Sequence, residues 1–376
     1  MDSRRLAFHI ENVVAWFAAS VLVSGAVVYA LKLDADKRKP PPLVNPRPAQ
    51  EPLTLQRMRA MEDGRGRKAS APTHIPWRGW KDIFARVWQE IQSDRLLALA
   101  AGVVFYCLLA LFPAIAAGVS SYALFADAGT ISNHLSLVAD VVPASAIDLL
   151  RDEIARIAGK SDGRLTFGFL LGLGIALWSA NAGMKSIFDA LNIIYDEDEK
   201  RGIVRLNVIS LFFTLCAIAA AMLAIGAIVV FPLALAAFGL SSLDEPIIGI
   251  LRWPVMFMLV IVSLAVLYRY GPSRRRARWR WLSVGSVFGA LAWLLVSSLF
   301  SYYLSNFANY NATYGALGAV VGLMVWMWLT TIVVLVGALI NSEIEHQTAR
   351  DTTVGRPKPL GSRGAVMADT VGAAQG

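Results

Sequence analysis

The chain has 376 residues, of which 56% are hydrophobic and only 16% are charged, and its mean hydropathy is +0.54. Because an ordinary soluble domain carries about 25% charged residues, this composition excludes a pair of soluble domains and predicts a polytopic membrane protein. The net charge of +8 is concentrated between long apolar runs, so membrane topology explains it better than nucleic-acid binding does.

The first 76 residues are predicted to contain a membrane anchor followed by a linker. An isolated apolar run at 13–31 has "MDSRR" before it and "KLDADKRK" after it, so residues 1–33 are interpreted as an N-terminal transmembrane helix that exits into the cytoplasm. A cleaved signal peptide is the alternative, although no clear small-x-small cleavage site follows the run. Residues 34–76 are rich in Pro, Gly and charge, which is typical of a flexible cytoplasmic linker.

Six further apolar runs predict the core membrane domain, residues 77–346. Each approaches or exceeds the length of about 20 residues that a helix needs to cross a bilayer, and none alternates as the strands of a barrel do. Because backbone in lipid must satisfy its own hydrogen bonds, the predicted fold class is all-α: a polytopic bundle of six core transmembrane helices plus the N-terminal one. The six runs are 96–125, 165–184, 204–240, 247–268, 281–304 and 314–340.

Two other segments have distinct patterns. The stretch 143–159, "PASAIDLLRDEIARIAG", places Ile147, Leu150 and Ile154 at helical spacing, which predicts an amphipathic helix on the outer membrane surface. The same helix could instead pack over the bundle as a lid. Residues 347–376 are rich in Gly and Ala without an apolar period, so a disordered cytoplasmic tail is expected.

The placement of the basic residues predicts the orientation of the core. Between the fourth and fifth runs, "YRYGPSRRRARWRW" holds six arginines, whereas the connection at 305–313 on the opposite side has no basic residue. The positive-inside rule then places both ends of the six-helix block in the cytoplasm. We expect Arg274, Arg275 and Arg276 to meet anionic membrane lipids, and we expect no nucleic-acid partner.

No pattern in the chain indicates catalysis. Cys107 and Cys216 each lie inside a predicted span and are interpreted as small buried hydrophobic residues, and the four His lack metal-ligand spacing. The run "YDEDEK" at 195–200 directs successive carboxylates to different sides, so a solvated cap is expected rather than a metal site. No catalytic residue, cofactor or metal site is therefore predicted.

The polar residues in and near the predicted spans are neutral, and hydrogen bonds between helices would explain most of them. The absence of deeply buried ionisable groups argues against proton coupling. The neutral polar connection "SNFANYNAT" at 305–313 is explained by a tight helical hairpin. The functional alternative is that tyrosines next to it line an outer opening near Tyr106. Candidate pathway residues are Tyr106, Pro113, Asn181, Asn192, Tyr310, Tyr314 and Asn341.

Four stretches resemble the YihY/BrkB family of bacterial inner-membrane proteins. They are "LALAAGVVFYCLLALFPAI" at 97–115, "LWSANAGMKSIFDALNIIYDEDEKRGIVRLN" at 177–207, "LYRYGP" at 267–272 and "NYNATYGALGAVVGLMVWMW" at 309–328. The resemblance covers residues 77–345 in the right order and spacing. It implies six membrane helices with cytoplasmic ends, in agreement with the charge pattern.

The resemblance implies less about function. Members of that family have been mislabelled as a tRNA-processing ribonuclease, and some are linked to serum resistance and to transport of envelope lipid or lipopolysaccharide. The chain is therefore expected to transport or handle an envelope lipid or another amphipathic component of the cell envelope. A structural or interaction role in the envelope is the main alternative, followed by small-solute transport, with a ribonuclease last. Leu339 stands where many members have Glu, leaving Asn341 and Glu343 nearby.

Overall fold

The computed structural model describes residues 52–125, 162–225, 245–306 and 316–375. The chain divides into two compact units, Met1–Gln50 and Glu51–Gly376, and every described residue belongs to the second unit. The predicted N-terminal anchor, the predicted amphipathic helix at 143–159 and the connection 307–315 all lie outside the described residues.

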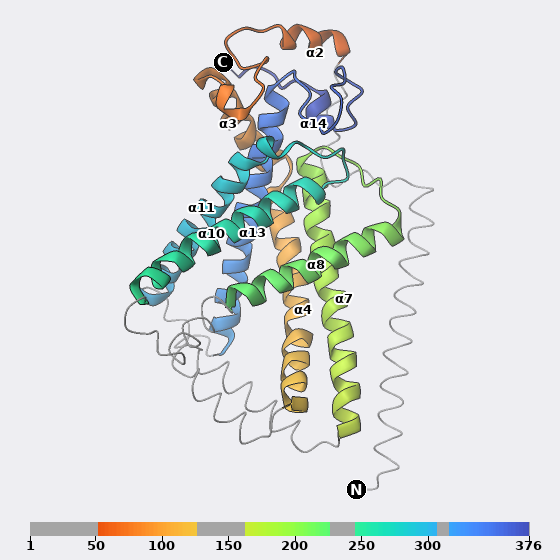
Figure 1. Ribbon diagram of the computed structural model, residues 1–376, viewed down its shortest axis with the longest axis vertical. Coiled ribbons are helices and arrows are strands. Elements are labelled where there is room, and N and C mark those ends of the chain that lie inside the picture. The colour runs from red at the N-terminus through yellow and green to blue at the C-terminus, as the bar shows by residue number, and fades with distance from the viewer. Residues whose placement is uncertain (1–51, 126–161, 226–244, 307–315, 376) are drawn as a thin grey trace. The chain divides into compact units, whose positions relative to one another are not determined.

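Within the described ranges every regular element is a helix, apart from one isolated β-bridge between Ala277 and Thr353. This confirms the all-α prediction for that part of the chain. Six long helices coincide with the six predicted apolar runs (Figure 1). They are α4 (Leu96–Phe125), α7 (Asp162–Ile194), α8 (Ile203–Ile225), α10 (Glu245–Tyr270), α11 (Ser283–Asn306) and α13 (Ala316–Gln347).

Several of these helices are long and apolar enough to cross a membrane. In the described residues the segments that qualify alone are Ile203–Ala220 of α8, Ser283–Leu304 of α11 and Val320–Gln347 of α13. A fourth span results if α3 (Trp77–Ser93) and the start of α4 count together, although they are bent by 59° at the break between them. The chain is thus a helical membrane protein, and six core crossings plus an N-terminal one remain a prediction.

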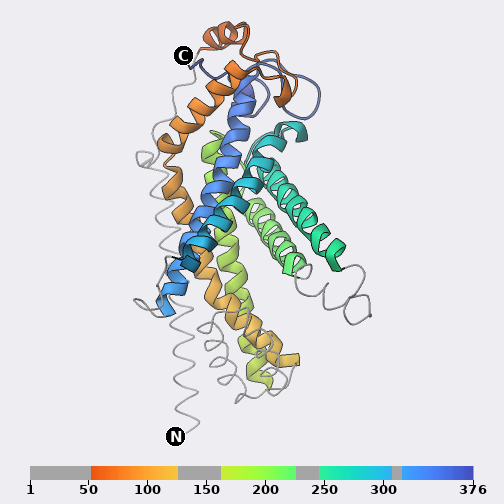
Figure 2. The same cartoon turned by 90° about the vertical axis from the view of Figure 1, so that its left-hand side faces the viewer.

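Polar links join the long helices at one end of the bundle, where the C-termini of α7, α10 and α13 meet the N-termini of α4, α8 and α11. Figures 1 and 2 show α4 and α7 lying side by side along their length, and α13 packs against α4, α7 and α11. The connection after α10 reaches α7, because the backbone N–H of Ser273 donates to Asn192 Oδ1 over 2.7 Å. Successive helices therefore alternate in direction.

Glycine allows α11 and α13 to cross in backbone contact. A Cβ atom added to Gly285 would lie only 2.0 Å from the carbonyl oxygen of Gly337, and one added to Gly337 would lie 2.8 Å from the carbonyl oxygen of Gly285. Small residues at such crossings let helices approach closely enough for dispersion contacts between their backbones. This crossing holds the polar end of α13 against the start of α11.

The two segments expected to be unstructured instead fold together, within the described residues, at the polar end of the bundle. Together with residues 77–95 of the predicted core domain, their described parts form what we call the polar cap, residues 52–95 and 347–375. It contains α2 (Leu53–Ala60), the short 3₁₀ turn η1 (Pro72–His74), α3 and the short α14 (Val366–Asp369). The segment 347–376 was expected to be a disordered tail, but its described part is ordered: Thr348 Oγ1 donates to the Ala69 carbonyl over 2.8 Å. The segment 34–76 was expected to be a flexible linker, but its described part contains the fully buried Arg67. Arg67 Nη2 donates to the Gly372 carbonyl over 2.8 Å.

In the described parts of 34–76 and 347–376, side-chain and backbone hydrogen bonds and a few buried apolar residues such as Ile75 and Met367 stabilise the polar cap without an apolar period, which is why composition predicted disorder there. Helix α3 adds an apolar face: Ile83 and Val87 are buried, whereas Trp77, Phe84 and Trp88 are exposed. A helix with exposed tryptophan and phenylalanine beside a membrane domain is typical of the membrane–water interface.

Candidate functional site

The predicted pathway residues that the structure describes are spread over three helices. Tyr106 and Pro113 lie in α4, Asn181 and Asn192 in α7, and Asn341 in α13. Tyr310 and Tyr314 lie outside the described residues, so their proximity to Tyr106 stays a prediction.

Two of the asparagines connect helices. Asn192, which is 5% exposed, accepts from the backbone of Ser273 and donates from Nδ2 to Glu199 over 3.0 Å. Asn341, which is fully buried, accepts from the N–H of Gly285 over 2.8 Å and donates to the Leu282 carbonyl over 3.2 Å. Both side chains satisfy backbone groups at helix ends, which is the interhelical role expected for neutral polar residues in membrane proteins.

Asn181 is different, because its Oδ1 is buried without a hydrogen-bond partner in the structure. It lies near the close approach of α7 to α4, where a Cβ added to Gly183 would be 3.5 Å from Cys107 Sγ. Tyr106, on the same stretch of α4, is 38% exposed. An unsatisfied buried carbonyl oxygen has a free-energy cost. Among the described pathway residues, Asn181 therefore has an acceptor for which the structure shows no donor.

A buried ion pair fixes the arginine-rich connection after α10 to the end of α13. Arg274 Nη2 and Nη1 donate to the two carboxylate oxygens of Glu345 over 2.7 and 2.9 Å, and the two side chains are 1% and 0% exposed. The Arg274 guanidinium also lies 4.0 Å from the ring centre of Tyr195. Burial lowers the pKa of Arg274, but the Glu345 carboxylate outweighs it and holds that pKa above its ordinary value. Arg274 is therefore a structural cation rather than a lipid-facing one.

A second buried ion pair joins α3 to α13. Arg86 Nε donates to Glu343, and Arg86 Nη2 donates to Gln347 Oε1 over 2.7 Å. Arg86 Nη1 also reaches the carbonyl of Ala373 in the polar cap over 3.0 Å. Replacing one partner of such a pair is costly because it leaves the other charge buried and unpaired. The acidic end of α13 thus anchors both the polar cap and the arginine-rich connection.

The acidic run at 195–200 is only in part the solvated cap that its sequence suggests, because Asp198 is exposed whereas Glu197 is buried. Glu197 is 3% exposed; its carboxylate accepts from Lys200 Nζ over 2.6 Å and from the backbone N–H of Val366 over 2.7 Å. Burial raises the pKa of Glu199, but hydrogen bonds and charge from Arg201 outweigh that effect and lower it to about 2. These carboxylates are engaged in structural contacts, and in the described residues no group of three or more His, Cys, Asp or Glu could hold a metal ion.

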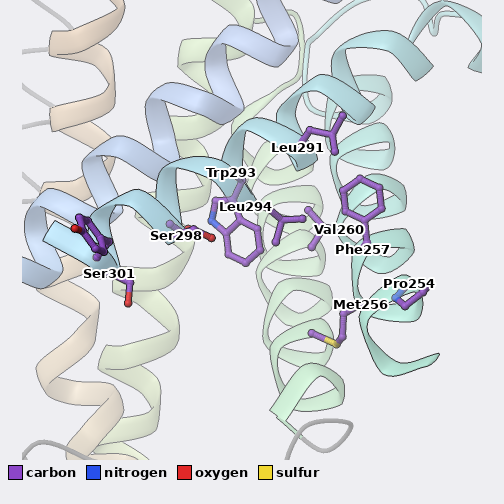
Figure 3. Close-up of a pocket in the computed structure, with 11 residues that line it drawn as sticks. Pro254, Met256, Phe257, Val260, Leu291, Trp293, Leu294, Ser298 and Ser301 are labelled. Carbon is purple, nitrogen blue, oxygen red and sulfur yellow. The ribbon is translucent and has the colours of Figure 1, made fainter. Parts of the chain in front are cut away.

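An apolar cavity of about 1010 Å³ lies between α10 and α11 (Figure 3). Phe257 and Val260 of α10 face Trp293 and Leu294 of α11 across it. Ser297, Ser298 and Ser301 of α11 also line it. We call this hollow the apolar cavity.

The sequence interpretation did not single out these cavity residues. Phe, Val, Leu and Ser within a transmembrane run are expected both at helix contacts and around cavities, so no local signal distinguishes the two. The buried charges offered a clearer signal: "NSEIEHQ" at 341–347 places two carboxylates directly after an apolar run. Carboxylates at that position need nearby cations, and the arginine-rich connection and α3 supply them.

Comparisons with known proteins agree with the helical membrane architecture. A family model described as Virulence factor BrkB matches residues 87–360. A ribonuclease-like protein, YfkH, of Bacillus subtilis is 31% identical over 268 residues, which cover 70% of this chain and 93% of that protein. A UPF0761 membrane protein of Photobacterium profundum is 26% identical over 72% of this chain and 82% of its own length.

A further UPF0761 membrane protein, from Verminephrobacter eiseniae, is 26% identical over 70% of this chain, and the match spans 62% of that relative's own length. No solved structure matches the chain. Because the family model and the Bacillus relative each cover most of the chain, the resemblance seen in its sequence motifs is confirmed, and this membrane protein belongs to the BrkB family.

Proposed function

We propose that the protein transports or handles an amphipathic component of the bacterial envelope, such as a lipid, in the inner membrane, with both ends of its six-helix block in the cytoplasm. The observation that carries this proposal is the apolar cavity between α10 and α11. Its volume of about 1010 Å³ is at the upper end of the range of about 300–1,000 Å³ that is common for ligand pockets.

The chemistry of the apolar cavity suits a long apolar ligand with a few polar groups. Its walls are mainly Phe, Val, Leu, Met and Trp side chains, while three serines of α11 follow one another along one side. Leu291 and Tyr302, which also line it, are 54% and 63% exposed, so a molecule in the surrounding bilayer can reach the cavity from the side. A hydrocarbon chain fits such walls, and the Ser298 hydroxyl group supplies a donor for an ester or hydroxyl oxygen.

A structural or interaction role in the envelope is the second candidate, and the buried ion pairs favour it. Arg86–Glu343 and Arg274–Glu345 hold the polar end of the bundle in one arrangement, as a scaffold requires. We propose that the protein has no enzymatic activity, and that it is not a ribonuclease despite the word in the name of the Bacillus relative. Support comes from Glu197 and Glu199, whose carboxylates are engaged by Lys200, Arg201 and backbone groups.

Among the predicted pathway residues, we propose that Tyr106 and Asn181 are the ones that contact a transported molecule, because Asn192 and Asn341 are occupied by helix-end groups. This assignment, like the predicted outer opening at Tyr310 and Tyr314, depends on a transport role.

The experiment that separates the two candidate functions is transbilayer lipid movement in liposomes that contain only the purified full chain. A fluorescent lipid in the inner leaflet is protected from a membrane-impermeant quencher until it moves outward. Transport predicts faster movement than in protein-free liposomes of the same composition. Equal rates in the two preparations, with the protein folded and inserted, would favour the structural role.

A further inference from the structure

A second hollow, of about 520 Å³, lies where α8 begins and α10 ends. Seven of the residues that line it are Lys or Arg, and none is Asp or Glu. We call it the basic cavity. Such a concentration of cations without acids creates a strongly positive potential, which attracts anions.

Three of the seven cations are neutralised inside the protein. Lys200, Arg201 and Arg274 each place a nitrogen 2.6–2.7 Å from a carboxylate oxygen. These ion pairs account for the structural part of the cluster. They leave four arginines without such an ion pair in the described part of the chain.

The remaining four arginines, on α8, on α10 and in the connection after α10, have no carboxylate partner among the described residues. They are Arg205, Arg269, Arg275 and Arg276. Nε and Nη1 of Arg269 and Nη1 of Arg275 are also buried without a hydrogen-bond partner. Buried donors left unpaired cost free energy, and a phosphate group, with several charged oxygens, pairs well with the planar guanidinium fork.

Aromatic rings position two of these guanidinium groups. Arg269 lies 4.3 Å from the ring centre of Trp279, and Arg276 lies 4.8 Å from that of Tyr270. Cation–π contacts of this kind hold a guanidinium plane while its N–H groups remain available at the edge. The donors are thus ordered before any ligand arrives.

Part of the lining of the basic cavity is apolar. Ile209, Phe212 and Phe213 of α8 and Val266 of α10 form it, and Phe212 is 63% exposed. These α8 residues belong to Ile203–Ala220, which is long and apolar enough to cross a membrane. The boundary between arginines and apolar side chains therefore matches the boundary between headgroups and hydrocarbon in a bilayer.

We propose that the basic cavity is a binding site for the phosphate-bearing headgroup of an anionic membrane lipid. The phosphate pairs with Arg205, Arg269, Arg275 and Arg276, and the first part of an acyl chain lies against Phe212 and Val266. A nucleic acid would use the same cations but gains nothing from the apolar wall. The inference goes beyond the proposed function, because a bound headgroup is compatible with either transport or a structural role.

The test is equilibrium binding to the purified full chain in neutral detergent, measured by native mass spectrometry. The probes are short-chain phosphatidylglycerol, phosphatidylcholine with the same chains, glycerol phosphate and a short RNA. Arg205→Gln/Arg269→Gln removes two of the proposed contacts. Arg78→Gln/Arg280→Gln is the control, because it removes the same charge from residues that do not line the cavity.

Saturable binding of phosphatidylglycerol is expected, about tenfold weaker in Arg205→Gln/Arg269→Gln and unchanged in the control variant. If Arg205→Gln/Arg269→Gln does not fold, Arg205→Gln/Arg276→Gln carries the same expectation, because both side chains are exposed. Equal weakening in the control, or equal binding of phosphatidylcholine, would overturn the site. Glycerol phosphate or RNA binding as tightly as phosphatidylglycerol would overturn the assignment to a lipid. Lipid movement in liposomes is a separate readout, so failure here is distinguishable from failure of the proposed function.

Discussion

Replacing Glu345 by Gln should strongly destabilise the protein, because it leaves a buried cation without its partner. The Arg274 and Glu345 side chains are 1% and 0% exposed and are joined by two hydrogen bonds of 2.7 and 2.9 Å. Breaking one partner of such a pair costs about 3–5 kcal/mol, and Glu345→Gln also weakens the contact that Thr352 Oγ1 makes with the carboxylate over 2.9 Å. Arg274→Met should lower the free energy of unfolding by about as much, because it leaves the buried Glu345 carboxylate without its cation.

The double variant Arg274→Met/Glu345→Leu removes both charges and replaces them with apolar groups, so we expect it to cost about 0–2 kcal/mol. The free energy of unfolding would be measured in mixed micelles of a neutral and a denaturing detergent. Arg280→Met, at an exposed position of the same connection, is the control and should change it by less than about 0.5 kcal/mol. If the costs of the two single variants simply add in the double variant, the two charges do not depend on each other and the reasoning is refuted.

Three further perturbations test other parts of the structure. Gly285→Ala should lower the melting temperature and separate α11 from α13, because its Cβ would lie 2.0 Å from the Gly337 carbonyl; an unchanged melting temperature would contradict this crossing. Burial, then the charges of Glu90 and Asp196, raise the pKa of Asp94 to about 8 from 3.8, so its contribution to stability is complete below about pH 4 and is lost as the pH rises through 8. Between pH 5 and pH 9 the free energy of unfolding of Asp94→Asn should therefore rise by about 1–3 kcal/mol relative to that of wild type. If the free energies of unfolding of the variant and of wild type depend equally on pH, this reasoning is refuted. Deleting residues 348–376 should lower the melting temperature and expose 52–76 to protease, whereas unchanged cleavage would contradict the folded polar cap.

The long helices were predictable because their signal is local and strong. Uncharged runs of about 20 residues require helices in lipid, and the six expected runs coincide with α4, α7, α8, α10, α11 and α13. Family membership was predictable for a similar reason, because stretches such as 97–115 and 309–328 carry specific residues in a fixed order.

The polar cap was not predictable, because its partners are far apart in the chain. Arg67 and Gly372 are 305 residues apart and Arg86 and Glu343 are 257 apart, and neither segment has an apolar period that reveals the contact. Composition measures the ability to bury apolar surface, whereas this region buries only a few apolar side chains, such as Ile75 and Met367, and depends largely on hydrogen bonds and ion pairs. Part of the acidic run at 195–200 was misinterpreted for the same reason, since the groups that pair with Glu197 include the distant backbone of Val366.

The candidate site was only partly predictable. Asn192 and Asn341 were predicted as candidate pathway residues, and a single sequence does not show that they accept hydrogen bonds from the backbone N–H groups of Ser273 and Gly285. The apolar cavity arises from the angle between α10 and α11, and such an angle is set by packing along both helices rather than by any short motif.

The measurement that tests the central claim most directly compares lipid movement in liposomes for two matched pairs of tryptophan substitutions on α11. Leu294→Trp/Ser298→Trp adds bulk to two residues, four positions apart, that line the apolar cavity. Leu295→Trp/Leu299→Trp introduces the same number of tryptophans at the next positions, which are 60% and 59% exposed and do not line it. The account predicts that the cavity pair reduces the lipid movement of wild type to the protein-free rate while the control pair retains it. Equal rates for the two pairs would contradict a role for the apolar cavity.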